Sequence, residues 1–154
     1  MDTALEFLSE NSAIYEEDYP YAAKDEECWQ EYIDKPEMFV ETDYMSGLPK
    51  IFWTVNGTKE ELQSALINVP VSVAIQADRP PFRNYQTGII DDKDCGDELN
   101  HGVTAIGFGT EGDQFYFIVK NSWGPRWGEG GFVRIAPGSC GILTDFVYAY
   151  ATNF

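Results

Sequence analysis

The chain has 154 residues, enough for one domain with a hydrophobic core and too short for two full domains. Its 10 basic and 26 acidic residues give a formal net charge of −16, so nucleic acids and anionic membranes are not expected as partners. With 44% hydrophobic and 15% aromatic residues, it is also not a disordered acidic tail. No apolar run approaches the roughly 18–20 residues that a membrane span needs.

Two helices are predicted in chain order. The first covers residues 2–10, where three apolar side chains have helical spacing: Ala4, Leu5 and Leu8. A second is predicted to begin after Thr58, because Thr58 and Glu61 have the spacing of a capping box, and to end at Pro70. Between them, Pro20 cannot continue a helix, and an extended segment is expected there.

The pattern changes to alternation after the second helix. The apolar residues at odd positions from Val69 to Ile75 predict a half-buried strand. Further strands are predicted over residues 101–108, 114–120 and 131–135, separated by glycine-rich turns. A helical and irregular first third, followed by mostly antiparallel strands with one helix, indicates the α+β class.

The only histidine, His101, begins a predicted strand directly after the acidic segment 91–98. A lone histidine is most often a structural residue, and catalysis is the alternative. The three cysteines are far apart, with no Cys-x-x-Cys or His-x-x-x-His pair, so no metal site is expected. No glycine-rich phosphate loop appears either, and no cofactor is expected.

The segment 120–132 places two tryptophans and several glycines directly after a predicted strand. A structural interpretation makes Trp123 and Trp127 a cover over the sheet edge. In a functional interpretation, Asn121 holds a catalytic imidazole, and Trp123 shields that hydrogen bond from water.

Three motifs are distinctive enough to indicate a protein family: His101-Gly102-Val103, Asn121-Ser122-Trp123-Gly124 and Trp127-Gly128-Glu129-x-Gly131. They closely resemble motifs of the papain-like cysteine peptidases, in particular of cathepsin L-like members. Earlier and later segments agree in family order: Met1-Asp2, Asp18-Tyr19-Pro20-Tyr21, Val69-Pro70-Val71-Ser72-Val73 and Cys140-Gly141-Ile142.

The resemblance implies a papain-like fold, mostly its β-barrel-like right domain with part of the helical left domain. The expected boundaries are 1–45 for the remainder of the left domain, 46–147 for the right domain and 148–154 for a C-terminal tail. The family places its nucleophilic cysteine well before the histidine, so the nucleophile is expected in a segment before residue 1.

The same resemblance suggests a use for each cysteine. Cys95 and Cys140 match a pair that is disulfide-bonded in relatives. Cys28 matches a half-cystine whose partner lies in the missing N-terminal segment, which explains the odd number.

The implied catalytic residues are His101 and Asn121, with Trp123 as catalytic support. Other positions match residues that line the substrate cleft in relatives: Met1, Ala74, Leu99, Asn100, Trp127 and Asp145. Asp145 would lie at the floor of the pocket for the second side chain before the cut. An acid there implies acceptance of Arg beside Leu or Phe, although one insertion or deletion before Asp145 would move it off the pocket.

The expected function is therefore the large fragment of a cysteine endopeptidase, inactive without its nucleophile segment. An inactive homologue that keeps the fold for binding, and a truncated gene product without a stable fold, are the alternatives. Expected partners are the N-terminal segment, linked through Cys28, then peptide or protein substrates, and cystatin-type or propeptide inhibitors. The expected location is lysosomal, a digestive vacuole or secreted, and Asn56-Gly57-Thr58 is a candidate N-glycosylation sequon.

Overall fold

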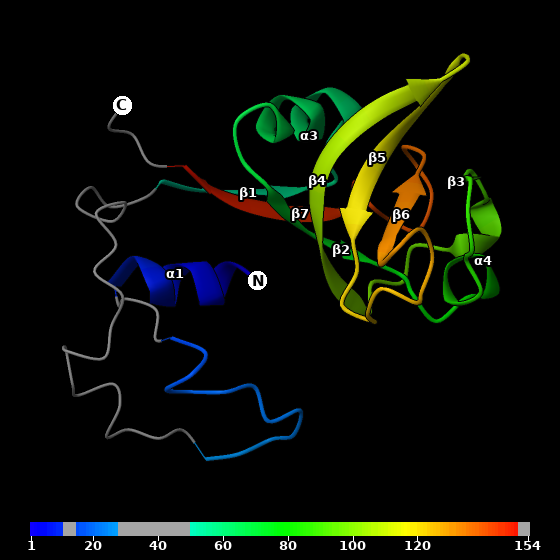
Figure 1. Cartoon of the computed structure of the whole chain (residues 1–154). Helices are drawn as coiled ribbons and strands as arrows, with labels where there is room; N and C mark the ends of the chain where they lie inside the picture. Colours follow the sequence, from blue (N-terminus) through cyan, green and yellow to red (C-terminus); the bar gives the residue numbers. More distant parts are fainter. Residues whose placement is uncertain (11–14, 28–49, 151–154) are drawn as a thin grey trace.

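A seven-stranded sheet dominates the structure, a computed structural model that describes residues 1–10, 15–27 and 50–150 (Figure 1). The order across the sheet is β1-β7-β2-β4-β5-β6-β3. Neighbouring strands are antiparallel, except that β3 runs parallel to β6. The strands are β1 (Lys50–Val55), β2 (Val71–Ile75), β3 (Ile89–Ile90), β4 (His101–Glu111), β5 (Gln114–Lys120), β6 (Phe132–Ile135) and β7 (Asp145–Tyr150).

Both predicted helices are confirmed. Helix α1 (Asp2–Glu10) contacts β1 and β7. Helix α3 (Lys59–Leu66) begins at Thr58 with both halves of the capping box formed, and packs its apolar face on β2 and β4. The helix ends at Leu66, before the predicted stop at Pro70. Two short elements were not predicted, α4 (Pro80–Arg83) and the 3₁₀ helix η3 (Lys93–Cys95).

The predicted strands are also confirmed, and they build the core. Val71, Val73 and Ile75 of β2 are fully buried, as the alternation indicated. Strands β1 and β7, which pair with each other, were missed. Strand β7 buries the consecutive residues Phe146 and Val147, which breaks the period of two that identifies a strand.

The α+β class is confirmed by this arrangement. The division at residues 45 and 147 stays a prediction; β7 runs through residue 147 and continues to Tyr150. Among the described residues, no helix combines the length and apolar character needed to cross a membrane.

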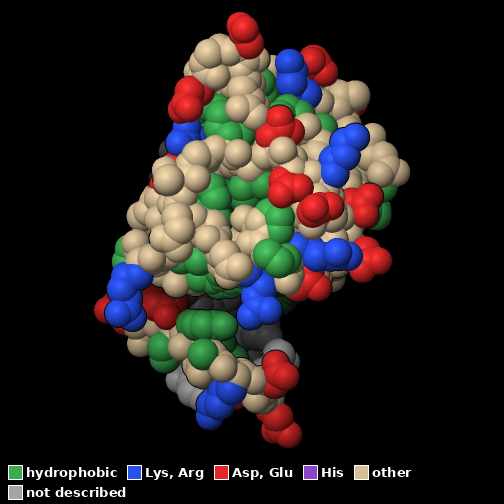
Figure 2. All heavy atoms as spheres, turned by 90° about the vertical axis from the view of Figure 1, so that its right-hand side faces the viewer, with side chains coloured by type: hydrophobic (Ala, Val, Ile, Leu, Met, Phe, Trp, Pro, Cys, Tyr) green, Lys and Arg blue, Asp and Glu red, His purple; other side chains and the backbone are tan. Residues whose placement is uncertain are grey.

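Charged side chains are mixed on the face that Figure 2 presents, which is the right-hand side of Figure 1. Acidic groups are the more numerous, and basic groups lie between them without gathering into one patch. On this face the charges are therefore distributed as on a solvated acidic surface.

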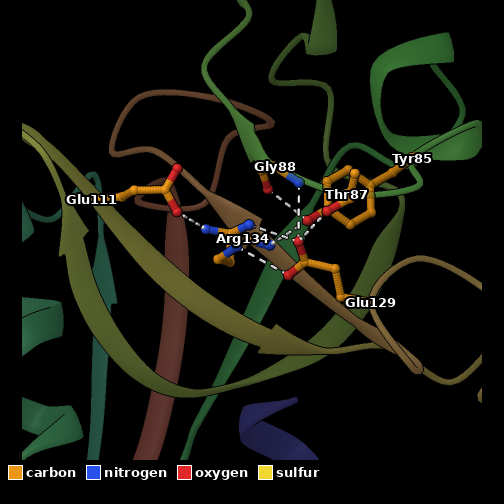
Figure 3. A network of polar contacts seen from close by, with 6 residues as sticks. All are labelled: Tyr85, Thr87, Gly88, Glu111, Glu129 and Arg134. Atoms are coloured by element: carbon orange, nitrogen blue, oxygen red, sulfur yellow. Dashed lines mark hydrogen bonds and ion pairs between the residues drawn. The ribbon is translucent and has the colours of Figure 1, made fainter.

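A network of ion pairs and hydrogen bonds centred on Arg134 joins strands β4 and β6 to two neighbouring loops (Figure 3). The Arg134 guanidinium donates to Glu129 from Nε (3.0 Å) and Nη2 (2.7 Å), and to Glu111 from Nη1 (2.6 Å). Glu129 also accepts hydrogen bonds from the Thr87 hydroxyl (2.8 Å) and the Gly88 N–H (3.0 Å). The Arg134 hydrogen bonds, aided by those from Gly88 and Thr87, lower the pKa of Glu129 to about 2.

We predict that Glu129→Gln destabilises the fold in a pH-dependent way. The ionised Glu129 contributes its full stability above its unfolded pKa near 4.5, and the contribution is lost as pH falls towards about 2. Because the side chain is 28% exposed, we expect a loss of about 1–2 kcal/mol at pH 6 in urea unfolding.

The matched control is Glu60→Gln, whose carboxylate lies 3.4 Å from Lys59 and is 75% exposed. It should change stability little at any pH. A Glu129→Gln loss that is equally large at pH 6 and near pH 2 would show that the charge of Glu129 does not carry the effect.

Candidate active site

The sheet brings His101 and Asn121 together. His101 is the first residue of β4, and Asn121 directly follows the last residue of β5. Since β4 and β5 are antiparallel, with Thr104 opposite Lys120, the start of one strand lies beside the end of the other. His101 Nε2 lies 2.9 Å from Asn121 Oδ1.

The second partner of that oxygen identifies the tautomer. The Ser122 N–H donates to Asn121 Oδ1 at 2.8 Å. A carboxamide oxygen only accepts hydrogen bonds, so His101 Nε2 carries the proton and donates. The other ring nitrogen, Nδ1, is then the one that can take up or release a proton towards a reacting group.

Asn121 is itself held in place and leaves one donor unused. The residue is only 7% exposed, and its backbone N–H donates to the Gly131 carbonyl at 2.9 Å. Its buried Nδ2 has no hydrogen-bond partner among the described residues. A buried unpaired amide donor costs on the order of 1–3 kcal/mol, so this group calls for an acceptor.

An aromatic cluster supports the imidazole. The Trp123 ring stacks on His101, with centroids 5.3 Å apart and an interplanar angle of 28°. Phe82 of α4 is fully buried and contacts both Trp123 (5.4 Å) and Trp127 (4.9 Å). Trp127 also donates from its indole N–H to the Arg83 carbonyl at 3.3 Å. Trp123 covers one face of His101 while remaining 44% exposed itself.

The turn that carries the two tryptophans depends on glycine. Gly128 has φ +54°, and a Cβ there would lie 2.6 Å from the Phe132 carbonyl oxygen and 2.9 Å from the Tyr85 ring. No other residue fits without displacing one of them. Gly128 therefore has a packing reason that is independent of any functional one.

A disulfide and a buried glutamine anchor the loop before His101. Cys95 is bonded to Cys140, the pair expected from the family resemblance. Gln76 is 1% exposed; its Oε1 accepts from the Glu98 N–H, and its Nε2 donates to Asp78, both at 2.8 Å. The end of the loop is fastened by Asn100, whose Oδ1 accepts from the Ala77 N–H at 2.9 Å.

A cleft of about 670 Å³ opens beside the imidazole. Its lining includes Asn100 and His101, which were predicted, and Asp78 and Arg83, which were not. Hydrogen bonds from the Gln76 and Asn100 side chains lower the pKa of Asp78. A run of charged residues and prolines directly after a strand is the signal that could have identified this part of the cleft.

The other predicted cleft residues do not line this cleft: Met1, Ala74, Leu99, Trp127 and Asp145. Ala74 lies opposite Gly102 in the β2–β4 pairing, and the Met1 Sδ lies 3.6 Å from where a Cβ on Gly102 would be. Leu99 packs closely against Gly141, and Asp145 is the first residue of β7.

The carboxylate of Asp145 already has a partner that the sequence did not suggest. Its Oδ1 accepts a hydrogen bond from the Trp53 indole N–H at 2.7 Å, across 92 residues of sequence. Cys28, the expected attachment point for a further segment, lies outside the described residues.

Comparison with known proteins identifies the family. The model of the papain family cysteine protease domain matches residues 1–150. The probable cysteine protease RD21B of Arabidopsis thaliana is 41% identical, covering 96% of this chain and 32% of that protein. Chymopapain of Carica papaya is 34% identical, covering 96% of this chain and 41% of its own length. The chain thus spans less than half of these relatives.

Solved structures agree with the sequence relatives. Bromelain from Ananas comosus, in complex with the E64 inhibitor, superimposes with a TM-score of 0.77 at 32% identity, covering 96% of this chain and 67% of bromelain. Digestive procathepsin L 3 of the Tenebrio molitor larval midgut gives 0.79 at 31% identity, covering 97% of this chain and 48% of its own. The fold is papain-like, and the chain belongs to the papain family of cysteine proteases.

Proposed function

We propose that this chain is the histidine- and asparagine-bearing part of a cysteine endopeptidase, with the nucleophilic cysteine on a segment N-terminal to residue 1. The observation that carries the proposal is the His101 Nε2–Asn121 Oδ1 hydrogen bond of 2.9 Å, which leaves Nδ1 available for a thiol. Cys95 and Cys140 are joined to each other and do not provide that thiol.

In this mechanism a thiolate–imidazolium pair attacks a peptide carbonyl. A free cysteine thiol has a pKa near 8.5, which a neighbouring protonated histidine can lower to about 3–4. His101 would stabilise the thiolate and then donate its proton to the leaving amine. Asn121 would hold the ring orientation and tautomer, and Trp123 would shield the hydrogen bond between them.

Two features support the presence of a further segment over the site. The Asn121 Nδ2 is buried and without an acceptor among the described residues, which an added backbone carbonyl would satisfy. The chain also spans only 67% of the bromelain structure that it otherwise matches over 96% of its own length. Cys28 would tie that segment to this chain by a disulfide.

The location and inhibitors follow from the same proposal. The disulfide Cys95–Cys140 fits an oxidising route, to a lysosome, a digestive vacuole or the outside of the cell. Propeptide or cystatin-type inhibitors would occupy the cleft beside His101. The bromelain relative is described with the E64 inhibitor and the Tenebrio relative as a proenzyme.

We predict that the full-length protein, with the segment preceding residue 1, hydrolyses peptides and takes an E-64 label on that segment. His101→Ala should lower kcat/KM by about 10²–10⁴-fold, the usual contribution of a general acid–base. Asn121→Ala should lower it less and should shift the pH profile of kcat/KM, because it acts through His101.

Asp113→Asn, in the exposed turn between β4 and β5, is the control and should leave kcat/KM unchanged. A full-length protein that folds and retains all these side chains but takes no label and cleaves nothing would instead support an inactive binding homologue. The 154-residue chain alone should be inactive in the same assay.

We further predict that Asp145 sets a dual preference at the second position before the cut. Asp145→Asn should lower kcat/KM for Arg substrates by about tenfold or more, because a charge-assisted hydrogen bond is lost, and should leave Leu substrates unchanged. Trp53→Phe, which removes the indole donor and frees Asp145 Oδ1, should raise the Arg-to-Leu ratio. Equal losses of Arg and Leu cleavage in Asp145→Asn would refute the assignment.

A further inference from the structure

The turn between β1 and α3 presents an exposed asparagine. Asn56 is exposed, with φ +52°, a left-handed conformation that asparagine tolerates better than most residues. Its backbone N–H donates to the Thr144 carbonyl at 2.7 Å, and the Gly57 N–H donates to the Leu143 carbonyl at 2.9 Å. The backbone of the turn is thus pinned to the chain before β7, while no described residue hydrogen-bonds to the Asn56 side chain.

The surroundings of Asn56 leave space on the solvent side. The preceding residue, Val55, is 55% exposed, and Trp53 is 60% exposed. The crowding is confined to the inner side, where a Cβ on Gly57 would lie 2.5 Å from the Phe146 ring. The sequence Asn56-Gly57-Thr58 therefore lies in a surface turn, which is the context an N-glycosylation sequon requires.

A second observation points to the compartment in which such sequons are used. Cys95 and Cys140 form a disulfide in the folded chain. Disulfides of this kind form in the oxidising lumen of the secretory pathway, where N-linked oligosaccharides are also added. Packing explains why residue 57 is glycine. The local structure does not require Asn56 or Thr58, because Asp is also suited to a left-handed turn position and to a helix N-cap. Asp at either position would remove the glycosylation sequon.

We propose that Asn56 carries an N-linked oligosaccharide that is attached before α3 forms. In the transfer, Asn56 Nδ2 forms a bond to the anomeric carbon of an oligosaccharide carried on a lipid pyrophosphate. The bond between that carbon and the pyrophosphate oxygen breaks, the lipid pyrophosphate leaves, and the amide nitrogen gives up one proton.

Thr58 belongs to both the sequon and the helix cap, and this determines whether glycosylation or helix formation comes first. In the folded chain its hydroxyl accepts from the Glu61 N–H (3.2 Å) and donates to Glu61 Oε2 (3.0 Å). The Thr58 N–H donates to the same carboxylate oxygen at 2.7 Å. The Thr58 hydroxyl, which a transferase must recognise, is therefore already hydrogen-bonded once the capping box has formed. Glycosylation thus has to precede formation of α3.

In the first test, the full-length protein is secreted from eukaryotic cells and digested with trypsin, and its peptides are examined for a glycan. Lys50 and Lys59 bound a peptide, residues 51–59, that holds the whole sequon and no other asparagine. We expect a glycan on this peptide, with Asn56 converted to Asp after peptide-N-glycosidase treatment. Secreted protein with an unmodified peptide would overturn the proposal.

Three variants separate the sequon from the helix cap. Thr58→Ser keeps both the cap and the sequon and should remain glycosylated, whereas Asn56→Gln should not. Thr58→Asp keeps a capping residue and loses the sequon, so it should fold without a glycan. A glycan on the 51–59 peptide of Thr58→Asp would also contradict the proposal. None of these measurements depends on peptidase activity.

The second test addresses timing. Unglycosylated full-length protein is prepared in two forms, one folded and one reduced and unfolded. Each form is incubated with solubilised oligosaccharyltransferase and lipid-linked oligosaccharide. We expect the folded protein to react about tenfold or more slowly, because α3 must open first. Equal rates for the two forms would contradict attachment before folding. A synthetic peptide of residues 51–59 is the positive control, which shows that the transferase is active.

Discussion

The antiparallel pairing of β4 with β5 is the constraint on which the site depends. It carries the start of β4 to the end of β5, so that His101 and Asn121 meet at 2.9 Å although 20 residues separate them. Neither residue has the other as a local neighbour, and the hydrogen bond exists only while the two strands keep their register. A one-residue slip would reverse the face of every side chain in the pair.

Three sets of interactions hold the loops around that pairing. Phe82 and Trp127 both contact Trp123 edge-on, and Trp123 in turn stacks on the imidazole. The Cys95–Cys140 disulfide and buried Gln76 fasten the loop that leads into His101, and Glu129 with Arg134 fastens the glycine-rich turn on the other side. Among the described buried side chains, Asn121 Nδ2 is the one nitrogen or oxygen atom without a hydrogen-bond partner.

Much of the fold and part of the site could be predicted because the signals are local. The Thr58–Glu61 spacing identified the start of α3, and the alternation ending at Ile75 identified β2. His101, Asn121 and Trp123 were recognised from short motifs. Strands β1 and β7 were missed because exposed residues such as Trp53 and consecutive buried residues break the expected period.

The sequence by itself determined the helix cap, the strand alternation, the family and the residue types of the site, since these depend on neighbours within a few positions. Only the tertiary structure decided that Asp78 and Arg83 line the cleft beside His101 and that Trp53 donates to Asp145. These contacts join segments up to 92 residues apart, and their geometry is set by sheet register and packing, which no local pattern encodes.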